Sequence, residues 1–315
     1  MELSRRRFIE LCGAAAGTGV GMSTAASAQA ASRPVESLNA PVHPGAPTLI
    51  VRDLGRVAAY YEESIGLHRL DADSETARLG AGGVTLLVLR KRPAAEQEAP
   101  GMAGLYHTAF LVPSRAELGA WLRSAIKARV VFDGASDHLV SESLYLSDPE
   151  GNGIEVYADR QRAGWKWVGK TVEMATNQLD IDGILADGAA LADRGSRVPD
   201  GTRVGHVHLR VGAIPEAERF YEQVLGFDIT RRRPGATFFS TGRYHHHLAT
   251  NVWESQNSPR RSGTTTGLAS LELIAKDTAA FDATAERLLA AGGRRTGDQI
   301  TAEDPWGNTV ILAKG

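Results

Sequence analysis

Two pairs of distant segments repeat each other along this chain, and an internal repeat limits the possible folds more than any other sequence feature. VRDLGRVAAYYEESIGL at 51–67 aligns without gaps with VGAIPEAERFYEQVLGF at 211–227. Each segment contains the end of a strand, a helix with apolar residues three and four apart, and a final glycine, Gly66 or Gly226. The repeat predicts that similar strand–helix units recur through the chain.

A second pair of segments completes the repeat. Residues 104–126 align with 267–289, and the sequences that follow them, SDPEGNGIEVY and EDPWGNTVILA, share an Asp-Pro-x-Gly-Asn turn. Gly and Asn supply the positive φ angles that such a turn needs. We therefore predict four strand–helix–strands modules and one connector with Trp165, Trp167 and a helix near 178–193. The modules span 44–92, 103–160, 203–255 and 266–315, and the connector spans 161–202.

The fold class follows from the shape of one module. A βαβββ unit leaves one sheet face uncovered, so an α+β fold is expected in which modules pair into half-barrels around a cleft. The chain has 315 residues, of which 43% are hydrophobic, and this is enough for two ordinary domains with cores. Along the chain, 44–160 holds the first two modules, 161–202 the connector and 203–315 the last two modules.

The first 28 residues have the composition of an export signal. Three arginines precede a short Gly/Ala-rich run and the small residues Ala26-Ser27-Ala28, where we expect cleavage. Ser4-Arg5-Arg6-Arg7-Phe8 resembles a twin-arginine signal, which would direct the folded protein through the twin-arginine export machinery to the bacterial periplasm. A disordered basic tail is the alternative. The only cysteine, Cys12, lies in this segment, so a metal site in the mature protein must use His and carboxylate.

Charge and hydropathy narrow the range of partners. The net charge is −2, and no basic block occurs after the N-terminus, so nucleic acid is not an expected partner. The apolar run from Leu11 to Met22 is too short to span a bilayer, and no stable membrane span is expected. The sequence leaves the oligomeric state open, a homo-oligomer included.

With these repeats, the chain resembles the vicinal oxygen chelate superfamily, which includes glyoxalase I, bleomycin and fosfomycin resistance proteins and extradiol ring-cleaving dioxygenases. The resemblance covers nearly all of the chain after the signal segment. It implies metal ligands on the first strand and on the last strand of a module. Five residues before the end of each first strand, the four modules have Ala46, His107, His206 and Ser270. The last-strand position holds Glu155 in the second module and Ile311 in the fourth.

The ligands that remain are His107, Glu155 and His206, all in the two central modules. Two histidines and one carboxylate form the ligand set of non-haem Fe(II) oxygenases, and Mn(II) stays open as an alternative. Metal binding would explain why Ile154-Glu155-Val156-Tyr157 has a carboxylate among apolar residues, where an unpaired charge is costly. A shared metal also requires module two to pair with module three, and module one with module four. His208 remains a rival for His206.

The resemblance extends to an extradiol dioxygenase signature around Glu155. Its spacing is matched by His138, Tyr145, Asp148-Pro149, Gly151 and Glu155. Two residues before the histidine, where the signature has a small or β-branched residue, this chain has Ser136. The family implies that His138 and Tyr145 form hydrogen bonds with the substrate hydroxyl or the bound oxygen species. In an isolated strand, Tyr145 would more commonly be a core aromatic residue.

GRYHHHLATNVW at 242–253 adds a run of three histidines. Alignment of Leu248-Ala249 with the corresponding family strand places His246 in the acid–base position, where a neutral imidazole can take and return a proton. Strand alternation predicts that His245 and His247 face the opposite side. A surface tract that captures metal is the alternative. Aromatic residues available to pack on a substrate are Phe238, Phe239, Tyr244 and Trp253.

Together the resemblances imply an extradiol, or meta, ring-cleaving dioxygenase that uses non-haem Fe(II) and O₂ on a small catechol-type aromatic diol, similar to four-module catechol 2,3-dioxygenases. Which catechol it cleaves stays open. One alternative is a glyoxalase-like lyase or isomerase with Zn(II) or Ni(II), which would need a fourth protein ligand. The other is a non-catalytic resistance protein that sequesters a small molecule. The metal ligands argue against this last alternative.

Overall fold

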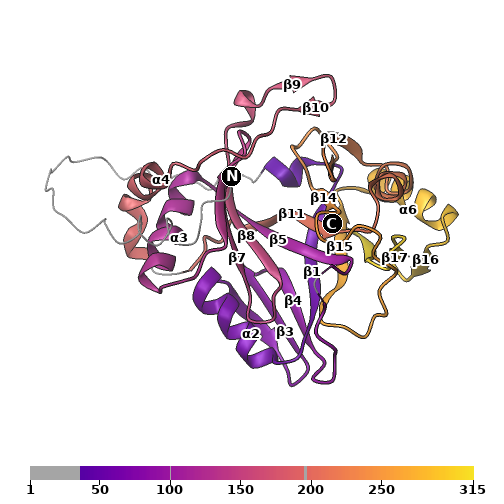
Figure 1. The fold of residues 1–315 in the computed structure, drawn as a ribbon, viewed down its shortest axis with the longest axis horizontal. Coiled ribbons are helices and arrows are strands. Elements are labelled where there is room, and N and C mark those ends of the chain that lie inside the picture. Colours follow the sequence, from indigo (N-terminus) through magenta and orange to yellow (C-terminus); the bar gives the residue numbers. More distant parts are fainter. Residues whose placement is uncertain (1–35, 100, 195–196) are drawn as a thin grey trace, which may run out of the picture.

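Two eight-stranded mixed sheets form the core of the protein in a computed structural model, which describes residues 36–99, 101–194 and 197–315 (Figure 1). The expected export signal, 1–28, lies outside the described residues. No helix within the described ranges combines the length and the apolarity needed to cross a membrane.

Strands from the two ends of the chain share the first sheet, in the order β16-β17-β18-β15-β1-β4-β3-β2. Within each half the first strand runs parallel to the last, and β1 joins β15 in antiparallel register. The strands are β1 (Val42–Val51), β2 (His68–Ala72), β3 (Thr76–Ala81), β4 (Val84–Lys91), β15 (Gly267–Ala275), β16 (Arg294–Thr296), β17 (Gln299–Glu303) and β18 (Thr309–Lys314).

Strands from the middle of the chain form the second sheet, in the order β12-β13-β14-β11-β5-β8-β7-β6. Here β5 and β11 are the antiparallel central pair, and β5 is parallel to β8 on its other side. The strands are β5 (Gly104–Val112), β6 (Gly134–Asp137), β7 (Ser141–Ser147), β8 (Gly153–Asp159), β11 (Arg203–Arg210), β12 (Asp228–Arg233), β13 (Ala236–Ser240) and β14 (Leu248–Asn251).

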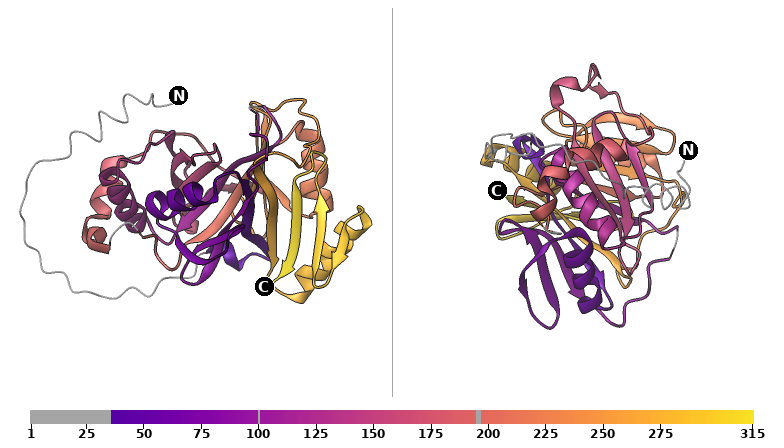
Figure 2. Two further views of the ribbon diagram at one scale, coloured as in Figure 1. Left: turned by 90° about the horizontal axis from the view of Figure 1, so that it is seen from below. Right: turned by 90° about the vertical axis from the view of Figure 1, so that its left-hand side faces the viewer.

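One helical segment follows the first strand of every module, as the repeat predicts. These segments are α2 (Leu54–Tyr60) with the π-helix η2 (Tyr61–Ile65), α3 (Arg115–Lys127), α5 (Ile214–Glu218) with the π-helix η5 (Arg219–Val224), and α6 (Thr278–Ala290). The predicted helix stops are confirmed, because Gly66 and Gly226 have φ angles of 87° and 80°. The pair α3 and α4 lies at the opposite end of the molecule from α6 (Figures 1 and 2).

The connector forms a hairpin and three short helical segments. It contains η3 (Arg162–Gly164), β9 (Trp167–Val168), β10 (Thr171–Val172), α4 (Ile181–Asp187) and η4 (Ala189–Arg194). The helix expected near 178–193 is therefore broken into α4 and η4, with Gly188 between them. A Cβ on Gly188 would lie 2.2 Å from the carbonyl carbon of Gly119 on α3, so this break allows close contact with α3.

Candidate metal centre

Three neighbouring strands bring His107, Glu155 and His206 together. On β5, Ala109 is opposite Glu155 of β8 on one side and opposite His206 of β11 on the other. His107 lies two residues before Ala109 and therefore points to the same sheet face. The residues come from positions 107, 155 and 206 of the sequence, but the register places their side chains around one small residue.

The donor atoms of these three residues converge. His107 Nε2 and His206 Nε2 are 3.2 Å apart, and Glu155 Oε2 lies 3.0 Å from the first and 3.1 Å from the second. All three side chains are buried. Metal–ligand bonds of about 2.0–2.2 Å at right angles separate neighbouring ligand atoms by about 3 Å. The spacing of these atoms therefore fits three ligands on one side of a metal ion.

Burial and hydrogen bonding set the charges of these ligands. Burial lowers the pKa of His206 to about 4, so this imidazole is neutral at pH 7 and has a lone pair for a metal. Burial opposes ionisation of Glu155, but the attraction and hydrogen bonds of His206 and His107 hold its pKa well below the usual range. A neutral imidazole and an anionic carboxylate are the protonation states in which these groups bind metals.

His208 does not belong to this cluster. Its Nε2 lies 3.0 Å from Asn251 Nδ2, and the Asn251 Oδ1 accepts a hydrogen bond from the Trp253 backbone at 3.2 Å. These contacts orient the Asn251 amide, so its NH₂ group donates to His208 Nε2 and occupies that lone pair. The histidine that joins His107 and Glu155 is thus His206.

His138 and Tyr145 form a hydrogen-bonded pair beside the cluster. Tyr145 on β7 is directly opposite Glu155 on β8, and its hydroxyl lies 2.6 Å from His138 Nε2. His138 Nδ1 lies 2.7 Å from the carbonyl oxygen of Ala175 in the connector, which can only accept. His138 therefore donates from Nδ1 and accepts from Tyr145 at Nε2. Burial lowers its pKa, in agreement with a neutral ring.

The three consecutive histidines precede β14 and are not part of a strand. The expected strand alternation is wrong, because 241–247 is an irregular turn in which Gly242 and Arg243 have positive φ angles, and His245 does not face away from His246. His245 Nδ1 lies 2.7 Å from His246 Nδ1, while His247 lies against Ser240 and Ser37. All three are buried, which contradicts the surface-tract alternative.

His246 is the histidine of this run that contacts the ligands most closely. Its ring centroid lies 4.1 Å from that of His206. The corresponding distance for His245 is 6.3 Å. The structure therefore places His246 next to the cluster of candidate ligands and His245 behind it.

Aromatic rings border the cluster on the side of His208. The Phe238 centroid is 5.1 Å from that of His246, and the Trp253 centroid is 5.5 Å from that of His208. Trp253 is 51% exposed and so reaches the surface. Of the other predicted aromatic residues, Phe239 packs on Tyr221, and Tyr244 packs on His245 and donates to Asp159.

Sequence reasoning missed two residues near the cluster. Tyr106 lies 4.9 Å from His208 and 5.4 Å from Trp253 between ring centroids. Asp159 follows Glu155 by four residues on β8, so the alternation of that strand could have placed both on one face. No comparable signal in the sequence indicates Tyr106.

Sequence comparison gives matches over both halves of the chain. The model of the Glyoxalase/Bleomycin resistance protein/Dioxygenase superfamily matches residues 42–156 and 203–312. A catechol-2,3-dioxygenase of Bacillus subtilis (strain 168) is 38% identical over 283 residues, which cover 87% of this chain and 98% of that protein.

Structure comparison gives fold matches at low sequence identity. A solved protein of Bacillus subtilis subsp. subtilis str. 168 has 13% identity and a TM-score of 0.57, with 86% of this chain and 84% of that chain covered. Glyoxalase I from Zea mays has 16% identity and a TM-score of 0.51, with coverage of 89% and 94%. These two likenesses concern the fold alone.

Proposed function

Because this chain belongs to the Glyoxalase/Bleomycin resistance protein/Dioxygenase superfamily, we propose that it is an extradiol dioxygenase that cleaves a catechol-type aromatic diol with O₂. The observation that carries the proposal is the convergence of His107, Glu155 and His206 beside the His138–Tyr145 pair. The identity to a catechol-2,3-dioxygenase across nearly the whole of that protein supports it.

We assign the three converging side chains to a divalent metal, with Fe(II) as the resident ion and Mn(II) as the alternative. When bound, Fe(II) supplies coordination sites for the two substrate oxygens and for O₂, together with the electron transfer that O₂ chemistry requires. The protein supplies His206 and Glu155 in their metal-binding protonation states. His206 Nδ1 is buried without a partner among the described residues, so ring packing against His246 and Tyr157 orients this ligand.

Three further side chains act on protons and hydrogen bonds. Burial lowers the pKa of His246 well below its usual range, so its ring is neutral and can accept a substrate proton and later return it. The Tyr145 hydroxyl, which donates to His138, can accept a hydrogen bond from a substrate hydroxyl next to Glu155. The buried surroundings exclude water and so strengthen these interactions.

We also propose that modules two and three form the catalytic half-barrel, and that modules one and four form a metal-free half-barrel. The strand order supports this pairing, since β5 to β8 share a sheet with β11 to β14. In the other sheet, Ala46, Ser270 and Ile311 stand at the ligand positions, and none of these side chains is a usual metal ligand.

The proposed activity is tested by oxygen uptake. Protein purified without oxygen and loaded with Fe(II) should consume O₂ with at least one member of a panel of catechols and form a yellow ring-cleaved product. Glu155→Gln, which removes the anionic ligand, is the control and should consume none. If the iron-loaded protein consumes no O₂ with any catechol, while Zn(II)- or Ni(II)-loaded protein isomerises a hemithioacetal, the glyoxalase-like alternative replaces this proposal.

We propose further that the protein is exported folded to the bacterial periplasm by the twin-arginine machinery, with residues 1–28 removed. The support is the arginine run followed by a short apolar segment and Ala26-Ser27-Ala28. Replacement of Arg5 and Arg6 by Lys should leave uncleaved precursor in the cytoplasm. Export of that variant at the original level would contradict the proposal, and Arg7→Lys alone is the control.

A further inference from the structure

A series of hydrogen bonds leads from His246 away from the ligand cluster. His246 Nδ1 lies 2.7 Å from His245 Nδ1, and His245 Nε2 lies 2.9 Å from Asp159 Oδ1. The His245 side chain is completely buried, whereas that of Asp159 is 19% exposed. The series therefore joins the ring beside the metal ligands to a carboxylate at the edge of the protein.

Asp159 is held by more than one donor. The Tyr244 hydroxyl donates to both carboxylate oxygens, at 3.1 and 2.9 Å. The Tyr157 hydroxyl lies 2.9 Å from that of Tyr244, and it donates to Tyr244 because the Tyr244 proton is directed at Asp159. The Trp165 ring packs against the His245 ring in a T-shaped arrangement, with the two centroids 5.0 Å apart. Asp159 is thus a fixed acceptor and not a mobile surface acid.

The acceptor character of Asp159 decides where the protons lie in both imidazoles. A carboxylate only accepts, so His245 carries its proton on Nε2. In the arrangement that we propose, His245 carries only this one proton, so its Nδ1 is a lone pair and the contact at 2.7 Å makes His246 the donor, from Nδ1. His246 Nε2 consequently has the free lone pair of its ring. No hydrogen bond joins this nitrogen to another residue in the described part of the chain.

We propose that Asp159 and His245 are positioning residues that keep His246 in the Nδ1-protonated tautomer, so that its Nε2 is available as the base for the substrate. The part that concerns turnover rests on the proposed dioxygenase function, and the tautomer does not. In a Ser-His-Asp triad, a carboxylate similarly sets the tautomer of one imidazole. Here the carboxylate acts through a second imidazole, because Asp159 does not contact His246 directly.

Asp159→Asn is the informative change because it keeps the size of the side chain and reverses one hydrogen bond. Tyr244 would still donate to the amide oxygen, which directs the amide NH₂ at His245 Nε2. His245 would then carry its proton on Nδ1 and donate to His246 Nδ1. The proton of His246 would move to Nε2, the nitrogen that the reaction needs free.

The tautomer is measured directly by two-bond ¹H–¹⁵N correlation spectra of ¹⁵N-histidine-labelled protein. The full chain is loaded with Zn(II), which is diamagnetic and inert to O₂, and the His246→Gln spectrum assigns the His246 signals. We expect the Nδ1-protonated pattern in the unchanged protein and the Nε2-protonated pattern in Asp159→Asn. An Nε2-protonated His246 in the unchanged protein, or the same tautomer in both proteins, would overturn the proposal.

Kinetics of the iron-loaded protein separate positioning from a general structural role. In Asp159→Asn we expect kcat to fall at least about tenfold, a part of the 10²–10⁴-fold that a general acid–base group contributes. The KM for catechol and the metal content should stay unchanged. Asp228→Asn, which alters an exposed ion pair with Lys170, is the matched control and should keep full kcat.

A second pair of variants tests His245 itself. His245→Asn keeps an amide oxygen that can accept from His246 Nδ1, and His245→Leu keeps none, so His245→Asn should retain the higher kcat. Equal losses in these two variants, or a higher KM with unchanged kcat in Asp159→Asn, would overturn the role in turnover. If the iron-loaded parent protein cleaves no catechol, the proposed function fails, and the NMR result still decides the tautomer.

Discussion

Ala109 determines the shape of the candidate metal centre although it provides no ligand. It is completely buried, and its neighbours across the two strand pairings are Glu155 and His206. Because its side chain is only a methyl group, the two longer side chains can converge above it with His107.

The first prediction concerns the choice between two histidines on β11. His206→Ala should remove stoichiometric iron, because His206 Nε2 is one of three converging donor atoms. His208→Ala is the matched control and should retain iron, because the Nε2 of His208 is occupied by Asn251. Metal analysis of both variants, with circular dichroism to show that they are folded, checks this. Iron loss from His208→Ala alone would instead make His208 the ligand.

The second prediction separates proton transfer from metal binding. His246→Ala should retain iron and bind catechol but lose about 10²–10⁴-fold in kcat, the usual contribution of a general acid–base residue. Tyr145→Phe should show a smaller loss, because it removes one hydrogen bond worth about 0.5–1.5 kcal/mol net. Oxygen-uptake kinetics measure both losses, and Tyr60→Phe on α2 is the control. Full activity in His246→Ala would mean that another group transfers the proton.

At the scale of elements, the connector links the catalytic sheet to the helix α3. Its Ala175 carbonyl accepts the hydrogen bond that orients His138, and its α4 packs against α3 at Gly188. Arg115 on α3 strengthens this contact through ion pairs with Asp180 and Asp187 of the connector. The connector is therefore part of the site and not a passive linker.

The third prediction follows from the close contact between α3 and α4. Gly188→Ala should lower the free energy of unfolding by about 1–3 kcal/mol, the usual cost of overpacking, because its Cβ would lie 2.2 Å from Gly119. Gly164→Ala, also in the connector, has no atom within 4 Å of the added Cβ and should change stability by less than about 1 kcal/mol. Urea denaturation compares the two variants. Equal stabilities would show that α4 moves freely away from α3.

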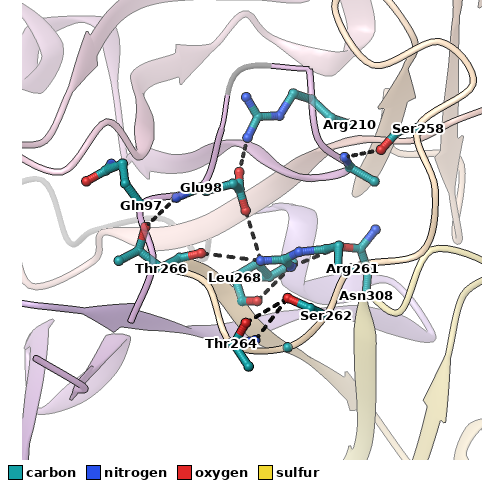
Figure 3. Close-up of polar contacts among 12 residues, drawn as sticks. Gln97, Glu98, Arg210, Ser258, Arg261, Ser262, Thr264, Thr266, Leu268 and Asn308 are labelled. Atoms are coloured by element: carbon teal, nitrogen blue, oxygen red, sulfur yellow. Dashed lines mark hydrogen bonds and ion pairs between the residues drawn. The ribbon is translucent and has the colours of Figure 1, made fainter. Parts of the chain in front are cut away.

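At the scale of the whole molecule, two linkers that the repeat relates to each other hold the sheets together. The linker between modules one and two runs beside the linker between modules three and four, with a bridge between Glu96 and Thr265. From the first linker, Glu98 binds Arg210 at the end of β11 and Arg261 of the second linker (Figure 3). The glutamate lies over Gly104 and Gly267, the first residues of β5 and β15, where a Cβ would collide with its carboxylate.

The fourth prediction concerns this buried ion cluster. Glu98→Ala should lower the free energy of unfolding by about 3–5 kcal/mol, because it leaves two arginines without their shared carboxylate in a buried place. Glu303→Ala, which removes the exposed partner of Arg260, should cost less than about 1 kcal/mol. Chemical denaturation measures both. A loss in Glu98→Ala no larger than in Glu303→Ala would show that the cluster does not join the sheets.

The sequence by itself determined the features that depend on neighbouring residues or on comparison of one repeat with another. The four helical segments, the glycine stops and the Asp-Pro-x-Gly-Asn turns are local features. Apolar residues three and four positions apart indicate the helices, and short Gly, Asn and Pro motifs indicate the stops and turns. The three candidate ligands follow from the resemblance to the vicinal oxygen chelate superfamily, which implies the ligand positions. The repeat adds that Ala46, Ser270 and Ile311 stand at the equivalent positions of the other modules.

Only the tertiary structure decided which groups meet across long separations in the chain. His245 and Asp159 are 86 residues apart, and no window of sequence shows that they contact each other. The turn at 241–247 overrides the strand alternation expected for the three histidines, because Gly242 and Arg243 adopt positive φ. The choice of His206 over His208 as the candidate ligand depends on the register of β11 against β5. The strands adopt the register that gives the whole sheet the lowest free energy.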